Sequence, residues 1–215
     1  MKGRAMSMLS VTQRRSLERA TMQYISHLDE ALDYLATRGI AEEVARSVGL
    51  GVVRNPIPGH EHLEGRLAIP YLTDYGPVNM NFRCLSAHKC KDEGHQKYMS
   101  WTGLETNLYS IQSMREADEW IAVAEGELDA LSLNIAGVPA VGIAGANKWS
   151  EHWNNVFEDF TRVYVFQDGD EAGKKFGDTL VSEIGALRVA LPPGEDVNSM
   201  LVKNGPEYLR GRIRT

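Results

Sequence analysis

The chain has 215 residues, enough for one large domain or two small ones with a hydrophobic core. Its 43% hydrophobic and 24% charged content is typical of a protein that folds in water. No apolar run approaches the roughly 18 residues of a membrane-spanning helix, and the start "MKGRAMSMLSVTQRR" lacks the apolar core of a signal peptide. We therefore expect no membrane partner. Two cysteines, Cys84 and Cys90, cannot build a disulfide framework, so we expect the protein to lie in a reducing cytoplasm.

The net charge of −6 argues weakly against a nucleic-acid partner. The distribution of charge is more informative, because basic residues gather near both ends and acidic residues lie between Glu116 and Glu171. Such a chain could hold a polyanion in one place and cations in another, although ordinary charge mixing on a solvated surface would give the same pattern.

The first half of the chain predicts helices and one strand pair. Apolar residues on one helical face predict a helix over about residues 16–36, and "AEEVARSVG" predicts a second, short helix. The runs "RLAIPYL" and "VNMNFRCL" predict an antiparallel pair joined by the turn sequence "TDYGP". Residues 86–97 are polar and predict a mobile loop.

From Trp120 onward, apolar runs alternate with helical patterns. "WIAVAE", "VPAVGIAG", "RVYVFQ" and "ALRVALP" predict four strands separated by helices, which is typical of a doubly wound parallel sheet. We therefore predict a mixed α+β part over residues 1–115 and an α/β part over residues 116–215. Ligands of such sheets bind at the carboxyl ends of the strands.

Acidic residues follow three of the four predicted strands. Glu125 ends the first strand, and Asp129 lies one helical turn beyond it. Asp168 and Asp170 follow the third strand, and Asp196 follows the fourth. Each acid alone would be an ordinary turn or N-cap residue, but three strand ends together favour a site. An all-oxygen set indicates Mg²⁺ or Mn²⁺, the ions typical of phosphoryl and nucleotidyl transfer.

Ordered motifs in the chain resemble a known family. "EGELDALSLNIAG", "VYVFQDGDEAGKK" and "LPPGEDVNSML" resemble the TOPRIM domain, which is shared by bacterial DnaG-type primases, topoisomerases and some nucleases. The "DGDEAG" form with "LPPGED" after the next strand resembles the primases in particular. "YLATRGI", "GRLAIPYLTDYGPVNMNFRCL" and "LYSI" are similar to the N-terminal subdomain of the primase RNA-polymerase core. The resemblance implies a TOPRIM Rossmann-like parallel sheet preceded by a mixed α+β subdomain, in a minimal phage-like version.

The resemblance also implies an activity and a site. The activity is that of a primase-type DNA-directed RNA polymerase, which makes short RNA primers from NTPs on single-stranded DNA in a bacterial or phage-infected cytoplasm. Glu125, Asp168 and Asp170 would be the catalytic acids. The same three residues, with Asp129 and Asp196, would hold Mg²⁺ or Mn²⁺.

Three basic residues match basic positions of the first subdomain in the family. Arg66, Arg83 and Lys97 would line a groove between the two parts and touch the template or the triphosphate. Plain surface charge explains Arg66 and Lys97 at least as well. Arg83 lies within an apolar strand, where a charge needs a partner, and it is the stronger candidate.

The chain departs from the family in several places. The zinc ribbon that usually opens a DnaG-type primase is not found, so the resemblance implies a separate zinc-ribbon protein and a replicative helicase as partners. Asn198 stands where many relatives have Asp, and a Lys that usually precedes "LYG" is not seen in "GLETNLYS". These departures leave two alternatives open, a TOPRIM nuclease and a non-catalytic DNA-binding accessory protein of replication.

The polar loop also contains a cluster of potential metal ligands. Cys84, His88, Cys90 and His95 form a Cys-x3-His-x-Cys-x4-His pattern. The spacing is unlike that of common zinc sites, and the family gives it no support. The sequence therefore predicts no structural zinc.

Overall fold

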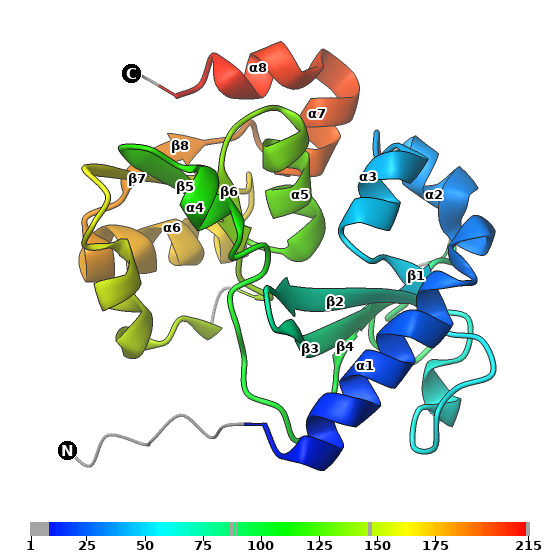
Figure 1. The fold of residues 1–215 in the computed structure, drawn as a ribbon. Helices are drawn as coiled ribbons and strands as arrows, with labels where there is room; N and C mark the ends of the chain where they lie inside the picture. The colour runs from blue at the N-terminus through cyan, green and yellow to red at the C-terminus, as the bar shows by residue number, and fades with distance from the viewer. Residues whose placement is uncertain (1–8, 87, 89, 146–147, 214–215) are drawn as a thin grey trace. The chain divides into compact units, whose positions relative to one another are not determined.

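The computed structural model describes residues 9–86, 88, 90–145 and 148–213. They form two compact units, whose elements are labelled in Figure 1. The N-terminal unit contains the described residues up to Leu35 and Ala41–Asn107, and the C-terminal unit contains Ala36–Ile40 and the described residues from Leu108 onward. In the part of the chain that is described, no helix is long and apolar enough to cross a membrane.

A four-stranded antiparallel sheet forms the centre of the N-terminal unit. Its strand order is β1 (Gly51–Val52), β2 (Leu67–Thr73), β3 (Gly76–Arg83) and β4 (Tyr98–Ser100). The predicted strand pair is confirmed as β2 and β3, whose register runs from Leu67 opposite Arg83 to Thr73 opposite Gly76. The sequence did not predict β4, because three residues are too few to show an alternating pattern.

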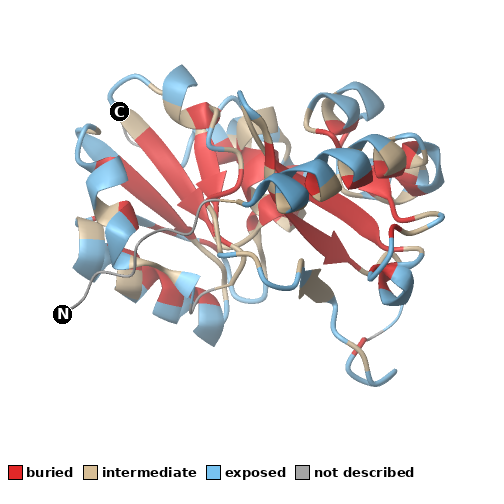
Figure 2. Ribbon diagram, turned by 60° about the horizontal axis from the view of Figure 1, so that its bottom comes forward, coloured by how far each residue is buried: buried red, intermediate tan, exposed pale blue. Residues whose placement is uncertain are grey.

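Helical elements accompany this sheet. They are α1 (Val11–Ile25), a 3₁₀ turn η1 (Leu28–Ala31), α2 (Leu32–Thr37, which runs into the C-terminal unit), α3 (Glu42–Ser47) and η2 (Glu61–Leu63). Of these, α1 and η1 contact the strands of the sheet. Helix α3 confirms the predicted short helix. Side chains of α1, including Leu17, Ala20 and Tyr24, form one core with Met80 and Phe82 of β3. In Figure 2 the strands of this sheet are mostly buried, as their apolar sequences require.

The prediction of one continuous helix over residues 16–36 is wrong. Helix α1 ends at Ile25, and the chain continues through η1 into α2. The apolar period continues across this break because Tyr24, Leu28 and Leu35 are all buried. At the break, Ser26 Oγ donates a hydrogen bond to the Gln23 carbonyl oxygen at 2.6 Å, a local bond that competes with continued helix.

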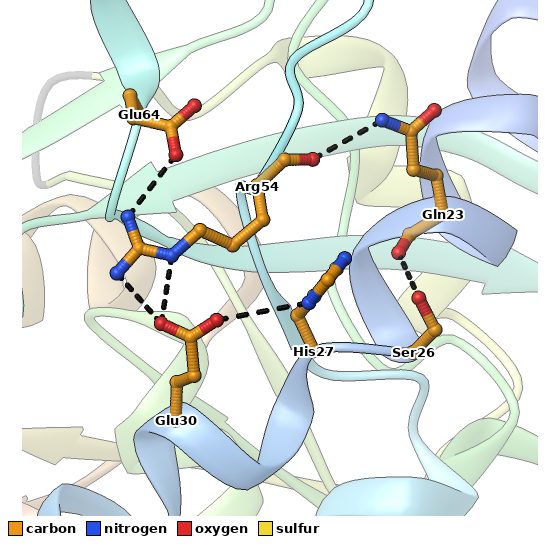
Figure 3. A network of polar contacts seen from close by, with 6 residues as sticks. All are labelled: Gln23, Ser26, His27, Glu30, Arg54 and Glu64. Carbon is orange, nitrogen blue, oxygen red and sulfur yellow. Dashed lines mark hydrogen bonds and ion pairs between the residues drawn. The ribbon is translucent and has the colours of Figure 1, made fainter.

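Polar contacts fix the chain at this break (Figure 3). Arg54 pairs with Glu30 at 2.6 Å and with Glu64 at 3.1 Å, and its carbonyl oxygen accepts a bond from Gln23 Nε2 at 3.1 Å. His27 Nδ1 lies 3.6 Å from Glu30 Oε1. These side chains are partly exposed, so each ion pair contributes only about 0–1 kcal/mol. The break was not readable from sequence because Arg54 and Glu64 lie far along the chain from α1.

A buried histidine makes the N-terminal unit sensitive to acid. The His60 ring packs edge-on against Trp101 with 4.1 Å between centroids, and its Nδ1 lies 3.0 Å from Tyr24 Oη. Tyr24 Oη accepts from the Ile57 amide, so its own proton points to Nδ1 and the ring is neutral. Burial lowers the pKa of His60 to about 4.

We therefore expect acid to destabilise the chain through His60. An unfolded histidine takes up a proton below its ordinary pKa of about 6.5, whereas native His60 stays neutral down to about 4. The contribution of His60 to the free energy of unfolding should fall by about 2–3 kcal/mol between these pH values, at about 1.4 kcal/mol per pKa unit. Urea unfolding of the unsubstituted chain and of His60→Gln at several pH values measures this contribution as the difference between the two curves. The difference should change by this amount between pH 6.5 and pH 4, whereas the exposed control His62→Gln should give a curve parallel to that of the unsubstituted chain.

A four-stranded parallel sheet forms the centre of the C-terminal unit. Its order is β6 (Ala140–Gly142), β5 (Trp120–Ala124), β7 (Arg162–Gln167) and β8 (Leu187–Ala190). All three pairings are parallel, which confirms the predicted sheet. The other elements of this unit are α4 (Ser113–Glu116), α5 (Glu127–Ile135), η4 (Glu151–Phe157), α6 (Glu171–Ile184), α7 (Val197–Asn204) and α8 (Pro206–Arg210).

The sheet of this unit has a continuous apolar core. Side chains of β5 and β7 pack with Phe176 and Leu180 of α6 and with Trp153 and Phe157 of η4. Helix α5 contacts β5 and β6, and α7 and α8 contact α5. The chain leaves the carboxyl ends of β5, β7 and β8 and continues into α5, α6 and α7 (Figure 1).

Candidate metal centre

The two central strands of the parallel sheet deliver the principal acids. Ala124 of β5 pairs with Phe166 of β7, so Glu125 and Asp168 follow neighbouring strand ends. Burial, with the charges of Asp129, Asp196, Glu125 and Asp170 in that order, raises the pKa of Asp168 to about 9. The structure thus brings the five predicted acids of this unit within electrostatic reach of one another.

One oxygen of Asp168 has a particular environment. Oδ1 is buried, and among the described residues it has no hydrogen-bond partner. Burial of a charged carboxylate oxygen without a hydrogen-bond partner costs free energy, unless a positive charge lies next to it. Without a cation, Asp168 therefore holds a proton at neutral pH.

Asp170 and Asp196 also cap helices. Asp170 is the N-cap of α6, and its Oδ1 accepts from the Gly173 amide at 2.8 Å. Asp196 is the N-cap of α7, and its Oδ1 accepts from the Ser199 amide at 2.6 Å. Negative charge at a helix N-terminus is favourable. From the sequence alone, an N-cap role was an alternative to a role in a site. Asp170 and Asp196 have the N-cap role and also belong to the acidic cluster.

Gly169 fits a tight contact between two loops. Its amide donates to Glu195 O at 2.8 Å, and its carbonyl accepts from the Gly194 amide at 3.0 Å. A Cβ at this position would lie 1.9 Å from Pro192 O and 2.7 Å from Pro192 C. The glycine between the two aspartates therefore lets the loop after β8 lie against the loop after β7, which brings Asp196 toward Asp168.

We expect Gly169→Ala to disturb both stability and the site. The added methyl meets backbone rather than a flexible side chain, so one of the two loops must move, at a cost of about 1–3 kcal/mol. Thermal unfolding measures this cost, and Mg²⁺ titration should show weaker binding. Gly211→Ala makes the same chemical change where the nearest atom is 3.3 Å away, so it should change stability and Mg²⁺ binding much less. If Gly169→Ala and Gly211→Ala changed stability and Mg²⁺ binding equally, the close contact of the two loops at Gly169 would not be the reason for its effect.

Asn198 positions Asp129, a role that the sequence did not reveal. Its backbone amide donates to Asp129 Oδ1 at 3.0 Å. Its buried side-chain nitrogen donates to Arg38 O at 2.8 Å and to Ser132 Oγ at 2.9 Å. Its side-chain oxygen accepts from Arg38 Nη1 at 3.1 Å. An aspartate could make none of the side-chain donations, so here Asn links α7 to α5 instead of adding a charge. The only sequence signal was its place two residues after Asp196, the cap of α7.

The predicted basic residues lie in the N-terminal unit. The Arg83 guanidinium is over the rings of Tyr98 and Tyr34, at 4.9 Å and 5.6 Å, and donates to Tyr98 Oη. Arg83 is 5% exposed, and its buried Nε has no hydrogen-bond partner in the described part of the chain. Arg66 Nη1 donates to Lys97 O at 3.4 Å, and Lys97 itself is exposed. The buried charge of Arg83 thus rests against aromatic rings.

Known proteins resemble this chain along most of its length. A family model described as Toprim-like matches residues 122–201. The chain is 33% identical over 150 residues to the Gene 57 protein of Mycobacterium phage D29, a match that covers 69% of this chain and 98% of that protein. It is 28% identical over 229 residues to the DNA primase of Pseudomonas aeruginosa, covering 85% of this chain. The chain belongs to one family with this phage protein, and it is similar to DNA primases over most of its length.

The fold of this chain agrees with that of solved primases. The RNA polymerase domain of Mycobacterium tuberculosis primase DnaG matches with a TM-score of 0.77 at 21% identity, over 95% of this chain and 83% of that one. A DnaG primase catalytic domain bound to ssDNA matches with a TM-score of 0.72 at 20% identity, over 94% and 82%. The family resemblance and the fold class predicted from the sequence are confirmed. The chain spans about a third of the P. aeruginosa primase, 34% of its length.

Proposed function

We propose that this chain is the catalytic core of a DNA primase, which joins NTPs into short RNA primers on a single-stranded DNA template. The observation that carries the proposal is the group of five acids around Asp168, at the carboxyl ends of a TOPRIM-like sheet. Similarity to DNA primases in sequence and in fold supports the same activity.

The acids fit a divalent cation of the magnesium type. The donor set is all oxygen, and the buried Oδ1 of Asp168 has no partner among the described residues. Glu125, Asp168 and Asp170 would hold Mg²⁺, or Mn²⁺, with Asp129 and Asp196 close by. When bound, the ion neutralises triphosphate charge and lowers the pKa of the attacking 3′ hydroxyl.

The protein's own residues prepare this site. Asp168 keeps a proton on its carboxyl group until a cation replaces it, because burial and four neighbouring acids disfavour its ionised form. Helix α6 fixes Asp170 through the Gly173 amide, and Asn198 fixes Asp129. The geometry is thus set before substrate arrives, which is what catalysis by positioning requires.

The N-terminal unit supplies the proposed contacts to nucleic acid. Arg66, Arg83 and Lys97 would bind phosphate groups of the template or the triphosphate. A DnaG primase catalytic domain has been solved bound to ssDNA, which supports this choice of ligand. A separate zinc-ribbon protein and a replicative helicase remain our proposed partners.

Primer synthesis on defined templates tests the proposed function. The full chain is incubated with ssDNA, labelled NTPs and Mg²⁺ or Mn²⁺, with and without a zinc-ribbon partner protein. We expect short RNA products that disappear in Asp168→Ala. Asp178→Ala, which removes an exposed aspartate of α6 paired with Arg188, should retain them.

Other products in the same assay would overturn the proposal. Shortening of the template without NTPs would identify a nuclease, which uses the same acids and the same ion. DNA binding with no product under any metal or partner would identify a non-catalytic accessory protein.

A further inference from the structure

The loop between β3 and β4 gathers four potential metal ligands. Cys84, His88, Cys90 and His95 each offer one ligand atom, and these four atoms all lie within 4.8 Å of one another. Cys84 Sγ lies 3.7 Å from His88 Nε2, which lies 2.7 Å from His95 Nε2. The sequence predicted no structural zinc here because the spacing is unusual, but the folded loop brings the ligands together.

The distances are close to those of a tetrahedral site. Zn–S bonds of about 2.3 Å and Zn–N bonds of about 2.0–2.1 Å place tetrahedral ligand atoms about 3.3–3.8 Å apart. The Cys84–His88 distance already lies in this range. To reach this range, His88 Nε2 and His95 Nε2 must move apart, and the two ligand atoms that are farthest apart must move closer together. Each change is about 1 Å or less. Side-chain rotation alone can supply such movements.

The backbone places His95 for this purpose. His95 Nδ1 lies 3.1 Å from the Gln96 carbonyl oxygen, which can accept the Nδ1 proton. That tautomer leaves Nε2 to face His88, and a carbonyl partner of this kind is usual for metal-binding histidines. Arg66 Nη2 lies 3.3 Å from the same Nδ1, but a guanidinium can only donate, so in this tautomer Arg66 makes no hydrogen bond to the ring, and its Nη1 donates to Lys97 O. The Gln96 carbonyl therefore holds the ring through the nitrogen that does not face His88.

Hydrogen bonds close the loop at its base and within it. The Cys84 amide donates to Lys97 O at 2.9 Å, directly beyond the paired residues Arg83 and Tyr98. The His95 amide donates to Cys90 O at 3.0 Å. The segment "SAHKCKDEGHQ" has almost no apolar side chains with which to build a packed core. A metal is the kind of cross-link that orders such a loop.

We propose that Cys84, His88, Cys90 and His95 bind one Zn²⁺ ion in a closed structural site. Two thiolates and two imidazoles match the ligand preference of zinc and differ from the all-oxygen acids of the other unit. All four coordination positions are filled by protein, so the ion has no open position for a substrate. The ion would cross-link the loop between β3 and β4, next to Arg66, Arg83 and Lys97. It does not depend on the proposed primase activity.

Metal content and spectroscopy test this site in the full chain. Protein purified with Zn²⁺ in the medium and dialysed should contain about one zinc per chain. X-ray absorption should show two sulfur atoms at about 2.3 Å and two nitrogen atoms at about 2.0–2.1 Å. Replacement of zinc by Co²⁺ should give the visible absorption of a tetrahedral ion with thiolate charge transfer in the near ultraviolet.

Substitutions distinguish this cluster from other ligands. Cys84→Ser with Cys90→Ser, and separately His88→Ala at an exposed position, should lower zinc content at least tenfold. His62→Ala, also exposed, and Asp168→Ala in the other unit should retain it. Far-ultraviolet circular dichroism shows whether each variant is folded.

Three results would overturn the proposal. The first is undiminished zinc in a folded Cys84→Ser, Cys90→Ser variant, and the second is an absorption spectrum without sulfur ligands. The third is a zinc-free chain, purified under reducing conditions, whose mass is lower by two hydrogens, because that mass indicates a Cys84–Cys90 disulfide.

Discussion

Replacement of Asp168 by asparagine will stabilise the metal-free chain and abolish its magnesium binding. Burial and neighbouring acids raise the pKa of Asp168 to about 9 in the folded chain, against an ordinary value of 3.8. In the unfolded chain the carboxyl group loses its proton near pH 4, while the folded chain keeps it. Stability is therefore lost as the pH rises from about 4 to about 9. Asparagine carries no charge, so it removes this loss, which we expect to be about 2–4 kcal/mol at pH 7.

Denaturation at several pH values measures this effect. In EDTA, the free energy of unfolding of the unsubstituted chain should fall from pH 5 to pH 8.5, and that of Asp168→Asn should fall much less. Asp178→Asn is the matched control, because Asp178 is an exposed aspartate that pairs with Arg188. Parallel pH curves for Asp168→Asn and the unsubstituted chain would show that Asp168 ionises normally in the folded protein.

Magnesium binding should release a proton for the same reason. At pH 7 the ion must displace the proton that Asp168 holds, so affinity should rise with pH toward about 9. Calorimetric titration in buffers with different ionisation enthalpies should count about one proton released per chain. Asp168→Asn should show neither binding nor release. Binding without proton release would place the ion away from Asp168.

The sequence predicted those parts of the fold that depend on local pattern. Four apolar runs separated by helical patterns were enough to identify the parallel sheet, and acids directly after the strands could be assigned to its carboxyl edge. The positions of Asp170 and Asp196 at the starts of helices could also be predicted, because a carboxylate directly before a helix is a common N-cap. The order of the strands is a property of tertiary packing and was not readable.

The features that were missed depend on contacts between distant residues. The bond from Asn198 to Asp129 joins positions 69 residues apart, so one-dimensional spacing made Asn198 look like a lost acid. Zinc spacing rules compare ligands along the chain, whereas Cys84 and His95 meet because β3 and β4 pair. The end of α1 was missed because the chain just beyond it is fixed by the pairing of Glu30 with Arg54, 24 residues away, which the apolar period does not record. In each case the contact that determines the structure is made by polar groups, and the apolar pattern of the sequence carries no information about it.

Arg83→Met should weaken nucleic-acid binding while leaving stability nearly unchanged. The guanidinium is buried against Tyr98 and Tyr34, and its Nε has no hydrogen-bond partner among the described residues. A buried charge in this state costs free energy, which methionine avoids while keeping the volume. A phosphate bound at the exposed part of the guanidinium would add charge-assisted hydrogen bonds, and hydrogen bonds to charged groups contribute about 1.5–3 kcal/mol. We therefore expect affinity for ssDNA to fall by about tenfold or more.

Binding as a function of salt separates this role from a structural one. Fluorescence anisotropy with labelled ssDNA should show a salt dependence reduced by about one phosphate contact in Arg83→Met. Arg83→Lys should also bind weakly, because lysine keeps the charge but lacks the planar group that stacks between the tyrosines. Arg46→Met, which removes an exposed arginine paired with Glu42 and Asp29, is the control for the same chemical change. A large loss of stability with unchanged ssDNA affinity would instead assign Arg83 to the core, where Tyr98 and Tyr34 hold its charge.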